Sequence, residues 1–222
     1  MVINQALASI VGVLQTFPVE RAAIARELVA GDYAVATYFF AKTVASLPFE
    51  VLFPAVFATV CFFMMNFIAA PSAVQWASFA GTVVLSASVS TSMGYFVSAL
   101  APTVAVALAI APVVLLPFIL FAGYLLNLSS ISPAFKPLEV LSLFKYAFAA
   151  LMKIVWQDVA TIDCGGTPLC PFPSGGAVLN FLSLGEGTPS IAADAAALAG
   201  LAVGWRLVAL CVMWLRSPKA SG

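Results

Sequence analysis

Hydrophobic residues fill the chain in long blocks, which short polar or Pro-containing turns separate. From Val51 to Phe135 there are 85 consecutive residues without Asp, Glu, Lys or Arg. A helix needs about 20 apolar residues to cross ~30 Å of hydrocarbon, so this stretch alone is long enough for about three crossings. Lipid offers the backbone no hydrogen-bond partners, and such spans must therefore be helical. The pattern predicts an all-α, polytopic membrane helix bundle.

We expect about five membrane-spanning helices in this bundle. The predicted spans are Ile3 to Phe17, Thr43 to Ile68, Val74 to Leu100, Val104 to Leu126 and Ile191 to Leu215. Pro18 is expected to end the first span, and a short helix from Arg21 to Val29 is expected outside the bilayer. Charged and apolar residues alternate from Phe135 to Trp156, which favours one or two amphipathic helices at the membrane surface. The segment from Thr161 to Pro189 is rich in Gly and Pro and is predicted to be irregular.

Composition and charge narrow the range of functions. The chain is 63% hydrophobic and 8% charged, whereas a soluble domain is about a quarter charged. Its formal net charge is zero, so nothing points to nucleic acid as a partner. There is no His, which removes the usual general base and the commonest metal ligand. The phosphate-binding pattern G-x-x-x-x-G-K-[ST] is also absent, so we expect no catalysis, no metal site and no cofactor in this chain.

The basic residues near the span ends indicate an orientation. With five spans, Arg21, Arg26 and Lys42 fall on the same side as Arg216 and Lys219 near the C-terminus. Because Lys and Arg are enriched in cytoplasmic loops, that side is expected to be cytosolic. The long loop before the last span is then expected outside.

Two charged residues within the predicted spans are candidates for function. An ionisable side chain inside the bilayer is costly, and it is a functional hypothesis by default. Glu50 is either functional or simply paired with a neighbour near the cytosolic interface, and the sequence leaves both readings open. Arg206 lies about 15 Å of helix rise from Arg216, so we expect it to have a partner inside the bundle. Asp194 is expected close to the outer surface with an interfacial role.

The four cysteines fall into two groups. Cys164 and Cys170 lie in the predicted outer loop, where an oxidising environment favours a disulfide between them. Free thiols and a disulfide across a dimer are the alternatives. Cys61 and Cys211 lie in predicted spans and are expected to be inert packing residues.

Several ordered blocks of sequence resemble one known family, the ABC-2 type membrane domain of White-type (subfamily G) ABC transporters. The blocks are Phe17-Pro18-Val19-Glu20-Arg21, Arg26-Glu27-Leu28, Gly31-Asp32-Tyr33, Leu47-Pro48-Phe49-Glu50, Leu116-Pro117-Phe118, Phe121-Ala122-Gly123-Tyr124, Phe144-Lys145-Tyr146 and Gly204-Trp205-Arg206-Leu207. The resemblance covers nearly the whole chain. It implies that residues 1–222 are a partial ABC-2 domain, and that a nucleotide-binding domain with its ATP and Mg²⁺, together with the first membrane helix, lies outside this chain.

The resemblance also implies roles for particular residues. It identifies Arg21 to Ala30 as the coupling helix that receives the motion of the ATPase. The coupling residues implied are Glu20, Arg21, Arg26 and Glu27. Leu116 and Ile119 match positions that line a cavity between two subunits, and Tyr124 and Leu125 match the plug above that cavity. Two apolar residues are usual at the plug, so Tyr124 departs from the family, as does Lys145 where Arg is usual.

The function implied is a dimeric, ATP-driven exporter of hydrophobic or amphipathic molecules such as a lipid, sterol, pigment or drug. The chain would be its membrane-spanning part, in a homodimer or heterodimer with another half-transporter. An alternative is a truncated, non-transporting subunit that regulates full-length partners. An intramembrane enzyme is a remote third possibility, because the chain lacks His and paired intramembrane carboxylates.

Overall fold

The computed structural model describes residues 1–30, 33–65, 72–122, 136–162, 172–185 and 187–216; for residues 21–23, 25, 26 and 28–30 it describes the backbone alone. These residues form helices and no strand. The helices are α1 (Val2–Ala30), α2 (Val35–Met65), α3 (Ala73–Leu100), α4 (Val104–Leu120), α5 (Lys136–Leu141), α6 (Leu143–Trp156), α7 (Gly175–Phe181) and α8 (Ile191–Arg216). The predicted all-α bundle is confirmed.

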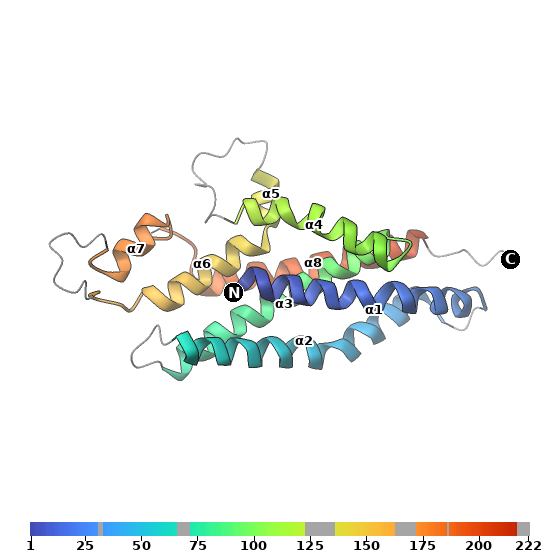
Figure 1. Cartoon of the computed structure of the whole chain (residues 1–222), viewed down its shortest axis with the longest axis horizontal. Coiled ribbons are helices and arrows are strands. Elements are labelled where there is room, and N and C mark those ends of the chain that lie inside the picture. The colour runs from blue at the N-terminus through green and yellow to red at the C-terminus, as the bar shows by residue number, and fades with distance from the viewer. Residues whose placement is uncertain (31–32, 66–71, 123–135, 163–171, 186, 217–222) are drawn as a thin grey trace.

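Four of the helices are long and apolar enough to cross a membrane. The candidate spans lie within α1, α2, α3 and α8, and these helices run along the long axis of the molecule (Figure 1). Helix α4 is apolar but has 17 residues, fewer than the roughly 20 that a span needs. The predicted fourth span continued to Leu126, and its last residues lie outside the described ranges. A fifth crossing therefore stays a prediction.

Helix α3 lies at the centre of the bundle and packs against α1, α2, α4, α6 and α8. Most of its second half is buried, including small polar residues. Their hydroxyl groups donate to carbonyls of the same helix, as in the bonds from Ser86 to Val83, Ser90 to Ser86 and Ser92 to Ser88, all at 2.7–2.8 Å. Small, internally satisfied side chains let neighbouring helices come close. At Gly94, an added Cβ would lie 3.1 Å from the Cβ of Val13 on α1.

The structure corrects the prediction that Pro18 ends the first span. Helix α1 continues through Pro18 to Ala30, so the span and the expected short outer helix are one helix. Proline removes a backbone donor, which usually bends or ends a helix. Here packing holds both sides of the proline, because Phe17 is fully buried and Ile24 is 8% exposed. The ring of Phe17 meets that of Tyr95 on α3 edge-on, at 5.3 Å between centroids.

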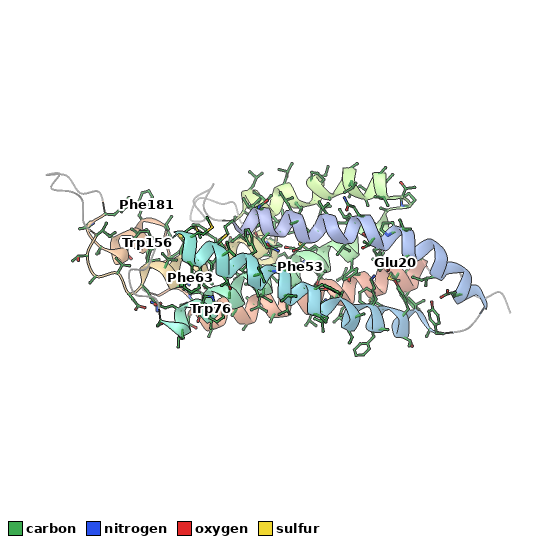
Figure 2. The ribbon with its side chains drawn as sticks, turned by 60° about the horizontal axis from the view of Figure 1, so that its bottom comes forward. Glu20, Phe53, Phe63, Trp76, Trp156 and Phe181 are labelled. Carbon is green, nitrogen blue, oxygen red and sulfur yellow. The ribbon has the colours of Figure 1, made fainter. Side chains whose placement is uncertain are left out.

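The second span also begins earlier than its predicted start at Thr43. Helix α2 starts at Val35, and Phe39 is buried against Tyr95 at 5.7 Å between ring centroids. Phe40, near the start of this helix, is 71% exposed. At the other end of the bundle, Figure 2 shows Phe63, Trp76 and Trp156 near one another.

Candidate functional site

The charged side chains inside the bundle form the candidate site, and its centre is an ion pair between Glu50 and Arg206. Glu50 lies midway along α2, and Arg206 lies on α8. The guanidinium Nη2 of Arg206 donates to the carboxylate Oε2 of Glu50, and the two side chains are only 18% and 7% exposed. Two charges this far from water need each other, because either one alone would be strongly destabilising.

Hydroxyl groups from two helices complete the surroundings of this pair. Ser46 Oγ, one turn earlier on α2, donates to Glu50 Oε1 at 2.7 Å. Arg206 Nη2 also donates to Ser88 Oγ of α3 at 3.3 Å. The Nε atom of Arg206 is buried without a hydrogen-bond partner among the described residues. The site therefore ties α2, α3 and α8 together and still holds one unused donor.

Arg206 thus has the bundle partner that its depth led us to expect. For Glu50, the sequence left open a functional role or a pair near the interface. The structure gives it a partner, but at the middle of α2 instead of near an end. Nothing in the local sequence links the two residues, because they are 156 positions apart. Their roles as functional intramembrane charges stay a prediction.

Polar residues extend from this pair along one face of α2. Tyr38, Lys42, Ser46 and Glu50 are spaced four residues apart, which places them above one another on the helix. The hydroxyl of Tyr95 on α3 donates to Ser46 Oγ at 3.2 Å. We call Tyr38, Lys42, Ser46 and Glu50 of α2, together with Arg206 of α8, the polar ladder.

At the N-terminal end of α2, the polar ladder contacts Glu20 of α1, one of the predicted coupling residues. Lys42 Nζ donates to Glu20 Oε1 at 2.7 Å, and the Tyr38 hydroxyl donates to Glu20 Oε2 at 3.2 Å. Glu20 therefore joins α1 to α2 instead of being free for a partner. Glu27 is exposed and accepts a hydrogen bond from the Tyr33 hydroxyl. Arg21 and Arg26 lie on α1, but their side chains are outside the described set.

A second ion pair lies at the opposite end of the bundle. Lys153 Nζ on α6 donates to Asp194 Oδ2 on α8 at 2.8 Å and to the Pro189 carbonyl at 2.6 Å. The side chains of Lys153 and Asp194 are 8% and 4% exposed. Asp194 lies in the first turn of α8, at one end of this candidate span, and the interfacial role expected of it stays a prediction. The sequence did not show that Asp194 and Lys153 are buried and paired.

The packing of α6 explains why Lys153 is buried. Its apolar face is buried against α3 and α8, with Leu143, Phe144, Ala147 and Ala150 in the core. Lys153 lies three residues after Ala150 on this side, and Asp194 supplies its countercharge. The amphipathic pattern predicted this helix, and its location at the membrane surface stays a prediction.

The remaining predicted positions divide between exposed, partly buried and undescribed residues. Leu116 on α4 is 56% exposed, and Ile119 packs partly against the core. Tyr124, Leu125, Cys164 and Cys170 lie outside the described residues, so the plug and the disulfide stay predictions. Cys61 and Cys211 are free thiols. Within the described part of the chain, no group of three or more Cys, Asp or Glu residues could hold a metal ion.

Comparison with known proteins gives this architecture a family context. Residues 1–156 match the family model described as ABC-2 type transporter. The chain is 32% identical over 219 residues to Protein white of Drosophila melanogaster, covering 97% of this chain and 31% of that protein. It is 32% identical over 149 residues to ABC transporter G family member 7 of Arabidopsis thaliana, covering 67% of this chain and 20% of the relative.

A third similar protein is the broad substrate specificity ATP-binding cassette transporter ABCG2 of Mus musculus. It is 30% identical over 149 residues, which cover 67% of this chain and 22% of the relative. The chain thus spans a third or less of the length of these curated relatives.

Proposed function

Since the chain belongs to the ABC-2 type transporter family, we propose that it is the membrane-spanning part of an ATP-driven exporter of hydrophobic or amphipathic molecules. The observation that carries this proposal is the family match over residues 1–156, which contain the predicted coupling segment and all of the predicted cavity and plug residues. The alternating-access motion would be driven by ATP hydrolysis in a nucleotide-binding domain outside this chain. That domain would hold ATP and Mg²⁺, for which this chain has no phosphate-binding motif.

The continuous helix α1 supports a direct mechanical role in coupling. At 1.5 Å per residue, its 29 residues extend about 43 Å, which exceeds the ~30 Å of bilayer hydrocarbon. The charged residues Glu20 to Glu27 fall on the extension beyond the apolar part. A force applied by a cytosolic ATPase to this extension would act on the same continuous helix that carries Leu14 and Phe17 in the core.

The polar ladder supports a route from that extension into the bundle. Glu20 is bonded to Lys42 and Tyr38 of α2, and α2 is bonded through Glu50 to Arg206 of α8. A displacement of α1 near Glu20 would therefore also displace α2. A displacement of α2 would in turn displace α8 through the Glu50–Arg206 ion pair. In this proposal the extension and the C-terminal end of α8 face the cytosol, as the distribution of basic residues predicts.

The proposed exporter is a dimer, homo- or heteromeric, in which Leu116 and Ile119 of α4 face a cavity shared with the partner. The exposure of Leu116 leaves it available for such a cavity. Tyr124 and Leu125 are proposed as the plug between the cavity and the exit.

Reconstitution tests the proposed function directly. The chain is placed in proteoliposomes together with a White-type half-transporter that carries a nucleotide-binding domain, and ATP-dependent movement of a fluorescent amphipathic dye is measured. We expect dye movement above that of liposomes containing the half-transporter alone. Lowered movement would contradict an exporter subunit and would favour the regulatory alternative.

A further inference from the structure

A groove between α1 and α2 has the features of a binding site that the predicted cavity on α4 does not include. It is an open groove of about 490 Å³ between one face of α1, residues 5–16, and one face of α2, residues 42–54, with Thr91 and Tyr95 of α3 also lining it. Small-molecule sites usually measure about 300–1,000 Å³. Figure 2 shows Phe53 near the middle of α2, on the stretch that borders the groove.

The lining of the groove combines hydrogen-bonding groups with aromatic rings. Polar side chains reach it from all three helices, namely Gln5, Ser9 and Thr16 of α1, Ser46 of α2, and Thr91 and Tyr95 of α3. Phe49 and Phe53 on α2 also border it, and their rings are nearly parallel, with 6.0 Å between centroids and 19° between planes. Both rings are more than 60% exposed. A flat ring system can stack beside such rings while its polar end meets the hydroxyl groups.

The charge of the groove selects against ions. Its two charged residues each have a countercharge next to them, Lys42 with Glu20 and Glu50 with Arg206. A charged ligand would therefore enter a membrane-embedded groove without gaining an unpaired opposite charge, and it would lose its hydration. A neutral molecule with hydroxyl or carbonyl groups loses much less hydration free energy on entering the groove.

We propose that this groove binds a neutral, flat-ringed amphiphile that carries a hydroxyl or carbonyl group and enters sideways from the bilayer. The inference deepens the proposed function, because it names a substrate class and an entry site, and it rests on that function for the meaning of binding. The alternative occupant of the groove is another transmembrane helix, which would pack on the small residues Ala8 and Gly12 of α1.

Gly12 offers a way to fill the groove without disturbing the fold. It lines the groove, and an added Cβ at this position meets nothing within 4 Å. The substitution Gly12→Leu therefore places a side chain in the open space of the groove. Gly204 provides a matched control, since it is an exposed helical glycine of α8 whose added Cβ also meets nothing within 4 Å.

The experiment uses the full chain in lipid nanodiscs and a photoreactive, diazirine-bearing cholesterol with a free hydroxyl group as the probe. Labelled peptides are mapped by mass spectrometry. We expect labelling of residues 5–16 and 42–54, at least a fivefold reduction in Gly12→Leu, and wild-type labelling in Gly204→Leu. A sulfated version of the same probe is expected to label these residues at least fivefold less. Equal labelling of wild type and Gly12→Leu, or of both probes, would overturn the proposal.

Two further readouts separate the alternatives. If a helix occupies the groove, Gly12→Leu will prevent assembly with the half-transporter in size-exclusion chromatography, and that result would overturn the small-molecule site. Binding is measured without ATP or a partner, so it is independent of export. Labelling of the groove without ATP-driven export would refute the proposed function, whereas export without such labelling would refute this inference.

Discussion

The carboxylate of Glu50 and the guanidinium of Arg206 form an ion pair across 156 positions of sequence, midway along α2. Removing one charge leaves the other buried, which costs about 3–5 kcal/mol in well-buried pairs. We therefore expect Glu50→Gln to lower the Tm of the detergent-solubilised protein by several degrees, as measured by fluorescence-detected size-exclusion chromatography after heating.

The matched control for this pair is the double variant Glu50→Gln with Arg206→Met, which removes both charges. Because no unpaired charge remains, its Tm is expected to lie above that of Glu50→Gln alone. Equal or greater loss in the double variant would show that the two residues do not depend on each other.

The ion pair between Lys153 and Asp194 predicts a contrast with the more exposed pair of Lys145 and Glu139. Lys153 is 8% exposed in its side chain, whereas Lys145 is 28% exposed. We expect Lys153→Met to lower the Tm clearly, because it leaves Asp194 unpaired. Lys145→Met should lower it by much less, since exposed pairs contribute about 0–1 kcal/mol. Similar Tm values for the two variants would contradict the burial of the Lys153 pair.

The close approach of α1 and α3 predicts a steep dependence on side-chain size at Gly94. An added Cβ there lies 3.1 Å from Val13 Cβ and 3.4 Å from the Ile10 carbonyl oxygen. Overpacking of this kind costs about 1–3 kcal/mol, so Gly94→Val should lower the Tm or prevent folding. Gly81→Val is the control, because a Cβ there meets nothing within 4 Å. A Tm loss at Gly81 as large as that at Gly94 would argue against helix packing as the cause.

The position of Glu27 on the extension of α1 predicts that this residue affects the coupling of ATP hydrolysis to transport. It is not expected to affect insertion of the protein into the membrane. In the reconstituted complex, Glu27→Lys reverses a charge on an exposed part of the extension. We expect at least a tenfold loss in dye molecules moved per ATP hydrolysed, with normal amounts of protein in the membrane. Glu27→Gln keeps an acceptor for the Tyr33 hydroxyl and serves to separate charge from hydrogen bonding. Unchanged transport by Glu27→Lys would remove the coupling assignment.

The proposed shared cavity predicts cross-linking between two copies of α4. In a variant without the four native cysteines, Leu116→Cys should form a disulfide-linked dimer on oxidation in membranes, seen by non-reducing electrophoresis. Leu115→Cys is the control, because Leu115 is 3% exposed and packs inside the bundle. Dimer formation at residue 115 but not at 116 would place a different face of α4 at the interface.

The sequence predicted the long helices well, because uncharged blocks of 20 or more residues have few alternatives in a membrane protein. It was wrong where α7 (Gly175–Phe181) lies, within the segment predicted to be irregular. It failed at Pro18, where local propensity favours a helix end. There the burial of Phe17 and the bonds of Glu20 to α2 outweigh the missing backbone donor. The hydropathy pattern does not predict tertiary packing of this kind.

The pairing of charges was also beyond what the sequence could show. Arg206 was expected to have a partner, yet nothing in the sequence identified Glu50 as that partner. Lys153 and Asp194 are 41 positions apart, and each alone has the pattern of a surface residue. The groove at Gly12 was missed as well, although Ala8, Gly12 and Thr16 recur every four residues, a spacing typical of small residues on one helix face.

The interface of α1 with α3 has a consequence for motion. On α1, Gln5 bonds to Ser9 and Thr16 bonds to the Gly12 carbonyl, and on α3 the hydroxyls of Ser86 and Ser90 likewise bond within their own helix. The close contact of Gly94 with Val13 shows that side-chain fit contributes to holding the two helices together. Fit of this kind resists separation but permits small axial sliding, the shear type of domain motion. A displacement of α1 along α3 would then also displace α2, because Glu20 is bonded to Lys42 and Tyr38.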